Sequence, residues 1–569
     1  MRSTFSRSDF YKLKYEPVYK KSFIKHINLE RKKTKLYVRI LYKEFNTFFN
    51  KDYPIDFWRA ILDFFMLYHV SLCRGYYFTK NIINEKRKFI KYFRILDKKF
   101  YYVPKDISDY RKFFQNSLLG DEQYFSFFIN FFFRNSKKKL FSNKDKDYFL
   151  YKSYIKKKKF FFFLIFKRFV NKILRYIINH KALITGCYWK ESDKINISFY
   201  SLGKIFFQNY YIPNSNKKYD LNLRKEFFNK VIKSTRLSQF DRFCLGTLIF
   251  AIPISLFENL NYRIDYTKNF IKKNKNLKFI FNENLSEDNL LVIAISRMSS
   301  IKTIYLEHNT LQRQSLGNII DLIKIKFDYY FTLGWKSKSK KLVPAGTNFK
   351  WYSEKYSVDK KIKYLFISDF PELNPPYLRS SYASSGVFNS ELWYRNNILF
   401  FKNLSDKIKE EIIFKEYPDV DNYLLHNNYN KFINYISSKS KVKFFKKGNE
   451  KKITPKLISL SKLVVINHLS TSYIQSLLAN VPTIIFCNYN YLYLEKNYRN
   501  FYKSLLKVNI LHNNPRSAAR FFNYLIKYNK VQDWWSSNET QLAKNNFLQK
   551  NINASDNLNK LILKTVSFG

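Results

Sequence analysis

The chain has 569 residues, of which 46% are hydrophobic and 20% aromatic, so it can bury real cores and is not intrinsically disordered. Its length allows roughly three domains. The formal net charge of +58 predicts attraction to anions such as nucleotide phosphates, acidic lipid head groups and acidic glycans. Nucleic acid is a less favoured partner, because the basic residues are spread along the chain and no nucleic-acid-binding motif is present.

The first part of the chain, 1–235, carries the apolar periodicity of long helices. One pattern begins at Trp58 and another at Phe125. The longest purely apolar run, 160–166, is far shorter than the roughly 20 residues of a transmembrane helix. Basic residues flank it, so it fits either a buried helix segment or an interfacial anchor. We predict a mainly helical N-terminal region that serves the acceptor or the membrane.

The cysteines and the first residues of the chain indicate the cellular compartment in which the protein works. Cys73, Cys187, Cys244 and Cys487 are not spaced as CxxC pairs, and they read as isolated, mostly buried thiols of a reducing compartment. The first residues lack the apolar stretch of a signal peptide. We therefore expect a cytoplasmic protein that can lie on the inner face of the cytoplasmic membrane, where anionic lipids attract basic patches.

From about residue 275, short apolar runs alternate with helix-length segments, which predicts parallel sheets covered on both faces. The predicted strands are 278–282, 303–307, 329–333, 363–368, 412–417, 441–445, 463–467 and 483–486. They are too many for one small sheet, so we predict two doubly wound lobes, 236–350 and 360–530, with a cleft between them. Residues 531–569 are predicted to form a C-terminal helix.

The segment 463–486 combines a strand, a helix start and a second strand. Asn467 ends the first strand, and His468 belongs to the turn that follows. Three hydroxyl residues then open the helix, namely Ser470, Thr471 and Ser472. Such a helix start satisfies its own N–H groups, and it also attracts phosphate. Gln475 lies one turn further, within reach of a ribose above the helix end. The segment is either an ordinary capped βαβ unit or a donor-binding site.

Three further positions follow predicted strands. Lys415 and Glu416 end the strand before Pro418, where a lysine can neutralise a donor phosphate or form a solvated surface pair. Glu307 and His308 end a strand of the first lobe, and a carboxylate beside an imidazole is a candidate general base. Arg379, followed by two serines, could receive an anion or belong to an ordinary loop.

Together these motifs resemble a bacterial family of transferases of surface carbohydrate biosynthesis. The resemblance is most specific over 460–550, where an Asn-x-Pro-Thr run and a Trp-Trp pair occur. Upstream segments that match the family are 44–67, 328–335, 307–309 and 412–421. The resemblance implies a GT-B-like fold, a nucleotide-activated donor and no required metal or cofactor.

The sequence departs from the family pattern at three places. Glu307 and Asn309-Thr310 replace Gln and Gly-Gly, which restricts backbone approach to a ligand. Lys415 replaces Arg and loses the bidentate fork. Gln475 replaces a helix Glu that accepts hydrogen bonds from the donor ribose in GT-B enzymes, and a Gln oxygen accepts more weakly. These changes predict a divergent member with an altered donor, or an inactive one.

The sequence thus predicts a glycosyltransferase that moves a sugar from a nucleotide-activated donor to a surface polysaccharide or a lipid-linked glycan. Two alternatives stay open. One is a phosphotransferase that takes a polyol phosphate from a CDP donor. The other is a non-catalytic scaffold that binds polyanions, which the net charge and the three departures favour.

Overall fold

A computed structural model gives the fold of the chain. The residues that it describes are 4–5, 20–78, 80–86, 90–115, 118–141, 180–187, 189, 191–213, 217–233, 236–307, 320–346, 360–368, 387–415, 427–440, 442–445, 454–469, 471–487, 496–552 and 558–568. The candidate anchor 160–166 lies outside this part of the chain. Within it, no helix is both long enough and apolar enough to cross a membrane.

The N-terminal region is mainly helical, as predicted. Its main helices are α2 (Lys20–Phe49), α3 (Ile55–Phe78), α4 (Lys80–Lys86), α5 (Ile107–Tyr110), α6 (Leu118–Phe132), α10 (Leu221–Lys233) and α11 (Gln239–Ala251). Helix α3 is buried along nearly its whole length and packs against α2, α11 and two helices of the first lobe. A small parallel sheet that the sequence did not predict is also present, formed by β1 (Thr4–Phe5), β2 (Tyr92–Leu96) and β3 (Lys138–Phe141).

The first lobe contains a six-stranded, fully parallel sheet with the order β5-β4-β6-β7-β8-β9. Its strands are β4 (Ala182–Thr185), β5 (Ile205–Phe207), β6 (Phe279–Asn282), β7 (Lys302–Leu306), β8 (Tyr329–Thr332) and β9 (Leu342–Pro344). The boundary predicted at residue 235 is wrong for this lobe, because β4 and β5 belong to its sheet. They are short and lie among helical patterns, so local periodicity did not separate them.

The first sheet is covered by helices on both faces. Helices α12 (Leu260–Lys273), α13 (Glu287–Met298) and α15 (Ile320–Lys326) belong to a core that continues into the N-terminal region. On the other face, α9 (Glu191–Tyr200) and α25 (Leu558–Phe568) bury Ile197, Ile562 and Val566 against the strands. The lobe is therefore doubly wound, as predicted.

The second lobe contains a second six-stranded parallel sheet, with the order β12-β11-β10-β13-β14-β15. Its strands are β10 (Ile362–Ile367), β11 (Ile412–Lys415), β12 (Lys443–Phe444), β13 (Ser461–Ile466), β14 (Thr483–Phe486) and β15 (Leu511–His512). Its helices are α16 (Val387–Lys402), α17 (Asp406–Glu411), α18 (Asn427–Lys439), α19 (Thr454–Ser459), α20 (Thr471–Leu478), α21 (Lys496–Lys507) and α22 (Pro515–Lys527). Two Rossmann-like lobes after a helical region confirm the predicted α/β, GT-B-like fold class.

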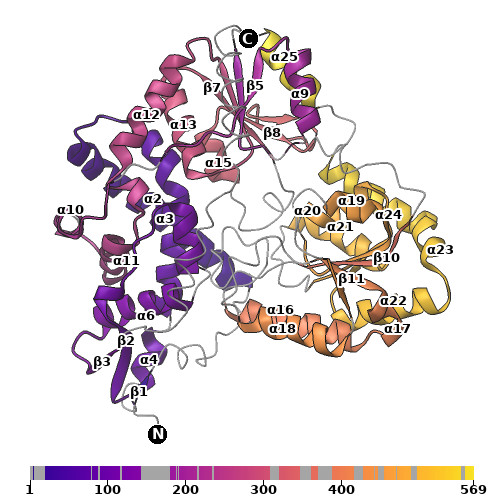
Figure 1. The fold of residues 1–569 in the computed structure, drawn as a ribbon. Helices are drawn as coiled ribbons and strands as arrows, with labels where there is room; N and C mark the ends of the chain where they lie inside the picture. The colour runs from indigo at the N-terminus through magenta and orange to yellow at the C-terminus, as the bar shows by residue number, and fades with distance from the viewer. Residues whose placement is uncertain are drawn as a thin grey trace.

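The described residues of the C-terminal segment form three helices, so the single helix predicted for 531–569 is wrong. Helices α23 (Val531–Ser536) and α24 (Asn538–Asn551) pack on the second lobe, whereas α25 returns to the first (Figure 1). The indole Nε1 of Trp535 donates to Asn480 O at 3.1 Å, and Lys544 donates to the same asparagine. The Trp-Trp pair and the Asn-x-Pro-Thr run are thus joined by a structural contact.

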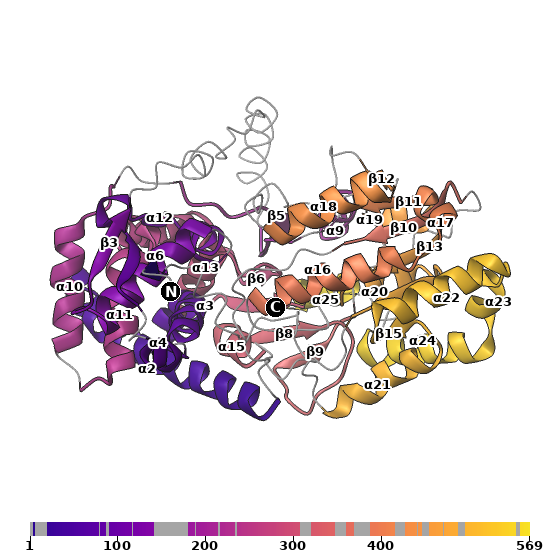
Figure 2. The same cartoon turned by 90° about the horizontal axis from the view of Figure 1, so that it is seen from below.

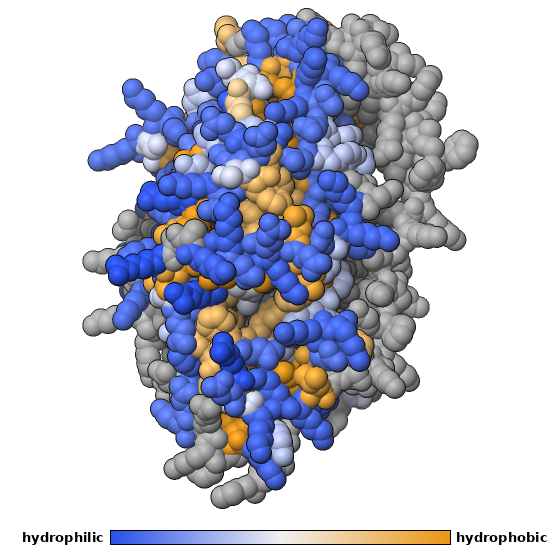
Figure 3. Space-filling model, turned by 90° about the vertical axis from the view of Figure 1, so that its left-hand side faces the viewer, coloured by the Kyte–Doolittle hydropathy of each residue, from blue (hydrophilic) through white to orange (hydrophobic). Residues whose placement is uncertain are grey.

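The N-terminal region and the second lobe lie at opposite ends of the molecule when it is seen from below (Figure 2). Figure 3 shows the outer face of the N-terminal region, which is mostly hydrophilic with hydrophobic spots between the polar side chains. The buried Lys326 of α15 donates to Asp63 of α3 at 2.9 Å and so ties this region to the first lobe.

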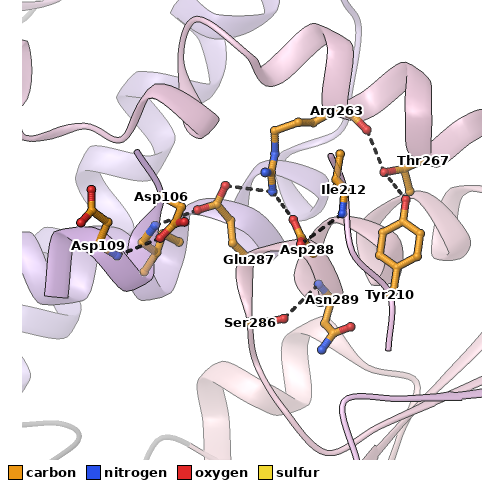
Figure 4. Close-up of polar contacts among 11 residues, drawn as sticks. Asp106, Asp109, Tyr210, Ile212, Arg263, Thr267, Ser286, Glu287, Asp288 and Asn289 are labelled. Atoms are coloured by element: carbon orange, nitrogen blue, oxygen red, sulfur yellow. Dashed lines mark hydrogen bonds and ion pairs between the residues drawn. The ribbon is translucent and has the colours of Figure 1, made fainter. Parts of the chain in front are cut away.

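A second polar junction joins α5 to the first lobe (Figure 4). Arg263 of α12 donates to Asp288 at 2.7 Å and lies 2.9 Å from Glu287, and both acids open α13. The other carboxylate oxygen of Glu287 accepts from the backbone N–H of Ile107 at 2.9 Å. Burial raises the pKa of Asp106 and of Asp288, and the charge of Glu287 raises that of Asp106 further. The guanidinium of Arg263 therefore forms ion pairs with Glu287 and Asp288 and also lies in the field of the buried Asp106.

Candidate functional site

The topology of the second sheet selects one edge as the candidate site. Its strand order corresponds to the 3-2-1-4-5-6 order of dinucleotide-binding folds, in which ligands bind beyond the carboxyl ends of the strands where the order reverses. The reversal lies between β10 and β13. Ile367 is in register with both Lys415 and Ile466, so Ser368 and Asn467 follow at the same level. The predicted residues Lys415 and Asn467 therefore lie at the reversal point.

Asn467 organises a buried polar network at this edge. Its Nδ2 donates to Ser368 Oγ at 3.2 Å and to Asn397 Oδ1 at 2.9 Å. The Nδ2 of Asn397 in turn donates to Trp393 O, which orients the amide on α16. Sequence reasoning missed Ser368 and Asn397. Ser368 ends a predicted strand, which was a usable signal, whereas Asn397 lies within a helix and gives no signal in its local sequence.

The sequence predicts His468 as a turn residue without a site role, but the structure places it in the same network. Its Nδ1 lies 2.8 Å from Asn467 Oδ1. The two hydrogen bonds donated by Asn467 Nδ2 fix the orientation of the amide, so its oxygen faces the imidazole and accepts from Nδ1. Burial lowers the pKa of His468 to about 3, and the charge of Lys415 adds to this effect. The imidazole is therefore neutral at pH 7, with its proton on Nδ1 and a lone pair on Nε2.

Lys415 supplies the positive charge at this edge. It ends β11 and is 4% exposed, so the side chain is almost fully withdrawn from water. Its backbone oxygen accepts from the N–H of Ser368 at 3.2 Å, which fixes the two strand ends side by side. A buried ammonium near a neutral imidazole can neutralise a phosphate as a point charge.

Helix α20 follows β13 directly and brings the remaining described candidates to the same edge. Thr471 and Ser472 lie in its first turn and are half-buried. Gln475 is 8% exposed, and its Oε1 accepts no hydrogen bond within the described part of the chain. A buried amide oxygen without a donor is costly, roughly 1–3 kcal/mol, so such a group in a native protein calls for an explanation. A ligand that donates a hydrogen bond to Gln475 would provide one.

Four predicted site residues cannot be located in this way. His308, Arg379, Glu416 and Ser470 lie outside the described residues. Their roles stay predictions.

In the first lobe, Glu307 lies directly after β7 and is buried. Its Oε2 accepts from the backbone N–H of Leu333 at 2.8 Å and from Trp335 Nε1 at 2.6 Å. Leu333 and Trp335 also pack against the hydrophobic core of the second lobe. The carboxylate thus supports the segment through which the two lobes touch, and its predicted role as a base stays untested.

The first sheet has its own reversal point, between β4 and β6, and this point holds a neutral polar cluster. Thr185 Oγ1 donates to Asn289 Oδ1 at 3.0 Å, and Asn282 ends β6 beside them. Gly186 has φ +63°, and a Cβ there would lie 2.5 Å from Asn289 Nδ2, so only glycine fits this turn. Sequence reasoning missed this cluster because it did not predict β4.

A group of potential metal ligands lies in the N-terminal region. The ligand atoms of His69, Cys73 and Cys244 lie within 4.8 Å of one another and are buried. The prediction of isolated thiols is therefore wrong for Cys73 and Cys244, which α3 and α11 bring together. Both ring nitrogens of His69 already have partners, Nε2 at 2.7 Å from Cys244 O and Nδ1 at 2.7 Å from Tyr124 OH. These contacts show that the three side chains belong to a buried hydrogen-bond network.

Nearly the whole chain matches one family. The model of the LIC12162 family transferase aligns with residues 2–566, which is nearly the full length. The chain belongs to the LIC12162 family of transferases. The prediction of an enzyme of the transferase class is thereby confirmed for this LIC12162 family member. No curated protein matches the chain significantly.

Solved structures that align with this LIC12162 family member are distant. An α,α-trehalose-phosphate synthase (UDP-forming) from Burkholderia vietnamiensis aligns at 9% identity and TM-score 0.36, over 68% of this chain and 98% of that chain. A UDP-GlcNAc 2-epimerase from Neisseria meningitidis bound to UDP-GlcNAc aligns at 10% identity and TM-score 0.38, over 68% and 100%. A glycosyltransferase from Rickettsia africae aligns at 11% identity and TM-score 0.36, over 68% and 99%.

Proposed function

We propose that this enzyme transfers a sugar from a nucleotide-activated donor to a surface polysaccharide or a lipid-linked glycan. The observation that carries the proposal is the reversal point of the second sheet. There, a buried lysine, a neutral histidine and a glutamine oxygen that accepts no hydrogen bond from the described residues occur where Rossmann-like lobes bind nucleotides. The family assignment supports the transferase class, and the site suggests the donor.

In this proposal, the donor diphosphate lies between Lys415 and the first turn of α20. The ammonium neutralises one phosphate, and the helix start offers N–H groups and the positive end of its dipole to the other. Gln475 Oε1 accepts from a ribose hydroxyl. Ser470 and Glu416 border the same helix start and strand end in sequence, so we assign them to the donor site as well, with Arg379 as an additional anion contact.

The acceptor would approach from the first lobe. We propose His308 as the general base that removes the proton of the attacking hydroxyl. Glu307 already accepts two hydrogen bonds on Oε2, so we assign it a positioning role for the segment that carries His308. Because Lys415 supplies the charge that a metal would otherwise provide, we also propose that transfer needs no metal or cofactor.

Thermal unfolding with a panel of nucleotides and nucleotide sugars tests the donor site. We expect at least one nucleotide sugar to raise the Tm of the wild-type chain and to lose this effect in Lys415→Met. The control is Lys462→Met, which removes an exposed lysine at the opposite end of β13. Absence of any shift across the panel, together with unchanged glycan synthesis in Lys415→Met, would overturn the proposal.

The two alternatives give different results in the same panel. Protection by CDP-glycerol but by no sugar nucleotide would favour the transfer of a polyol phosphate. Protection by long polyanions alone, unaffected by Lys415→Met, would favour the scaffold.

Kinetics of two variants separate the roles of Glu307 and His308. Loss of a general base lowers the rate by about 10²–10⁴-fold, so His308→Ala should fall in that range. Glu307→Gln keeps an acceptor oxygen for Leu333 and Trp335, and we expect it to retain most of the activity. A comparable loss in Glu307→Gln would make Glu307 the base instead. Activity unchanged by a chelator would support the absence of a metal.

A further inference from the structure

The outer end of the first lobe carries an exposed apolar surface that packs against nothing in the described part of the chain. Helix α9 buries Ile197 against the sheet but exposes Ile195 and Phe199, which lie one turn apart on its other side. Phe199 is 75% exposed, and Leu202 in the turn after the helix is 80% exposed. Tyr200 between them is also exposed. Large apolar side chains gathered in one place on a surface mark an interaction site.

A row of lysines runs along the amino-terminal edge of the same sheet and begins beside this turn. The backbone N–H of Lys181 donates to Lys204 O, that of Lys278 to Lys181 O, and that of Lys302 to Lys278 O. These four residues therefore stand at the starts of the neighbouring strands β5, β4, β6 and β7, about 4.8 Å apart from strand to strand. Lys204, Lys278 and Lys302 are exposed.

The segment before β6 adds further positive charge to this edge. Lys272 and Lys273 end α12, Lys275 follows, and all three are exposed. The acid at the start of β8, Asp328, accepts from Thr303 N–H at 2.8 Å and lies 3.9 Å from Arg297, which offsets its charge. The edge is thus strongly basic and adjoins the apolar side chains of α9. We call this combination the α9 surface.

We propose that the α9 surface docks the protein on an anionic lipid bilayer. Its lysines would meet the head-group phosphates, and Phe199 and Leu202 would enter the acyl boundary. This inference does not depend on the proposed sugar transfer, because the surface lies at the opposite edge of its sheet from the strand ends that would face the acceptor.

Charge and chemistry favour this occupant over two others. A second copy of the chain would bring another net charge of +58, and the two copies would repel each other. Nucleic acid would suit the lysines, but it offers no apolar phase for Ile195 and Leu202. A bilayer with anionic head groups satisfies both parts of the surface.

Binding of the full-length chain to lipid vesicles tests the proposal. The probes are vesicles of phosphatidylcholine alone and of an equimolar mixture with phosphatidylglycerol, followed by co-sedimentation. One variant combines Phe199→Ser with Leu202→Asn, since Leu202 has φ +51° and asparagine tolerates that conformation. The other combines Lys204→Glu, Lys278→Glu and Lys302→Glu.

Matched controls come from the second lobe. Lys361→Glu, Lys443→Glu and Lys462→Glu change the same charge at the strand starts of the second sheet, and all three lysines are exposed. Leu542→Ser with Tyr528→Ser removes two exposed side chains, which are 62% and 53% exposed. Circular dichroism confirms that each variant is folded.

We expect the wild-type chain to bind the mixed vesicles and not those of phosphatidylcholine alone. Each lysine near an anionic surface contributes roughly fivefold, so the triple lysine variant should bind about a hundredfold more weakly. Loss of Phe199 and Leu202 should cost a similar factor, because each buried side chain of this size contributes roughly tenfold or more. Both controls should stay within about threefold of wild type, since their positions belong to the second lobe and not to the α9 surface.

Three outcomes would overturn the proposal. The first is binding that does not depend on phosphatidylglycerol, or no binding at all. The second is an equal loss in variants and controls. The third is a different occupant: a dimer in solution that the apolar variant abolishes would assign the surface to a second copy. Tight RNA binding that only the lysine variant abolishes would assign it to nucleic acid.

Discussion

The two lobes each contain a six-stranded sheet in which all strands are parallel, yet the side chains at the two reversal points differ in charge. In the first lobe, Thr185, Asn282 and Asn289 form a neutral cluster around a glycine turn. In the second lobe, Lys415 brings a buried positive charge beside the neutral imidazole of His468. The buried charge of Lys415 therefore distinguishes the second reversal point from the three neutral side chains at the first.

The lobes also differ in how protons affect them. Burial raises the pKa of Asp106 and Asp288 at the junction with the first lobe, so this junction becomes relatively more stable as the pH falls. Burial lowers the pKa of His468 to about 3 and that of His512 to about 4, so the second lobe loses stability as the pH falls. Acid should therefore weaken the proposed donor lobe first.

The largest expected effect is on the first lobe. Arg263→Ala would leave the carboxylates of Glu287 and Asp288 without their guanidinium, and breaking such a buried pair costs about 3–5 kcal/mol. Denaturant unfolding measures this loss. The control is Asn269→Ala on the exposed side of the same helix, which should change stability by less than about 0.5 kcal/mol. A similar result for both variants would mean that the junction contributes little.

The next effect concerns the charge difference between the reversal points. Lys415→Ala should weaken binding of the nucleotide donor about a hundredfold, because a buried hydrogen-bonded charge contact is lost. Asn282→Ala at the first reversal point should leave donor affinity within about twofold. Calorimetric titration of both variants measures the contrast. Equal losses would show that the charge of Lys415 does not select the lobe.

A smaller effect concerns pH. The unfolded chain protonates His468 near pH 6.5 while the folded one does so only at about 3, so stability is complete above pH 6.5 and falls as the pH drops towards 3. Between pH 7 and pH 5 this loss amounts to about 2 kcal/mol. His468→Asn should remove that part of the slope. Hydrogen exchange across β13 and α13 shows which lobe opens first.

The smallest effect has opposite signs in two measurements. Gln475→Leu replaces a buried oxygen that has no donor among the described residues with a side chain of similar size, so the free energy of unfolding should rise by about 1 kcal/mol. Donor affinity should fall about tenfold if a ribose hydroxyl uses that oxygen. Higher stability with unchanged donor affinity would assign Gln475 to the core rather than to the site.

Local sequence was sufficient to predict much of the second lobe. The strands around 363–368, 412–417, 463–467 and 483–486 are confirmed with shifts of at most a few residues at their ends, because each is a short apolar run between polar breaks. The helix that begins at Thr471 was predicted from its hydroxyl-rich start. These elements also predicted that Lys415 and Asn467 lie at the same edge of the sheet, since parallel strands place their carboxyl ends together.

The tertiary structure decided what depends on contacts between distant residues. The pairing of β4 with β6 extended the first lobe beyond the predicted boundary, and α25 returned to that lobe after two helices on the other. Asn397 accepts a hydrogen bond from Asn467, 70 positions away in the sequence. Glu307 accepts hydrogen bonds from Leu333 and Trp335. Periodicity encodes an element because its residues are neighbours in the chain. The partners of a buried polar group are set by chain closure and packing, which no local pattern records.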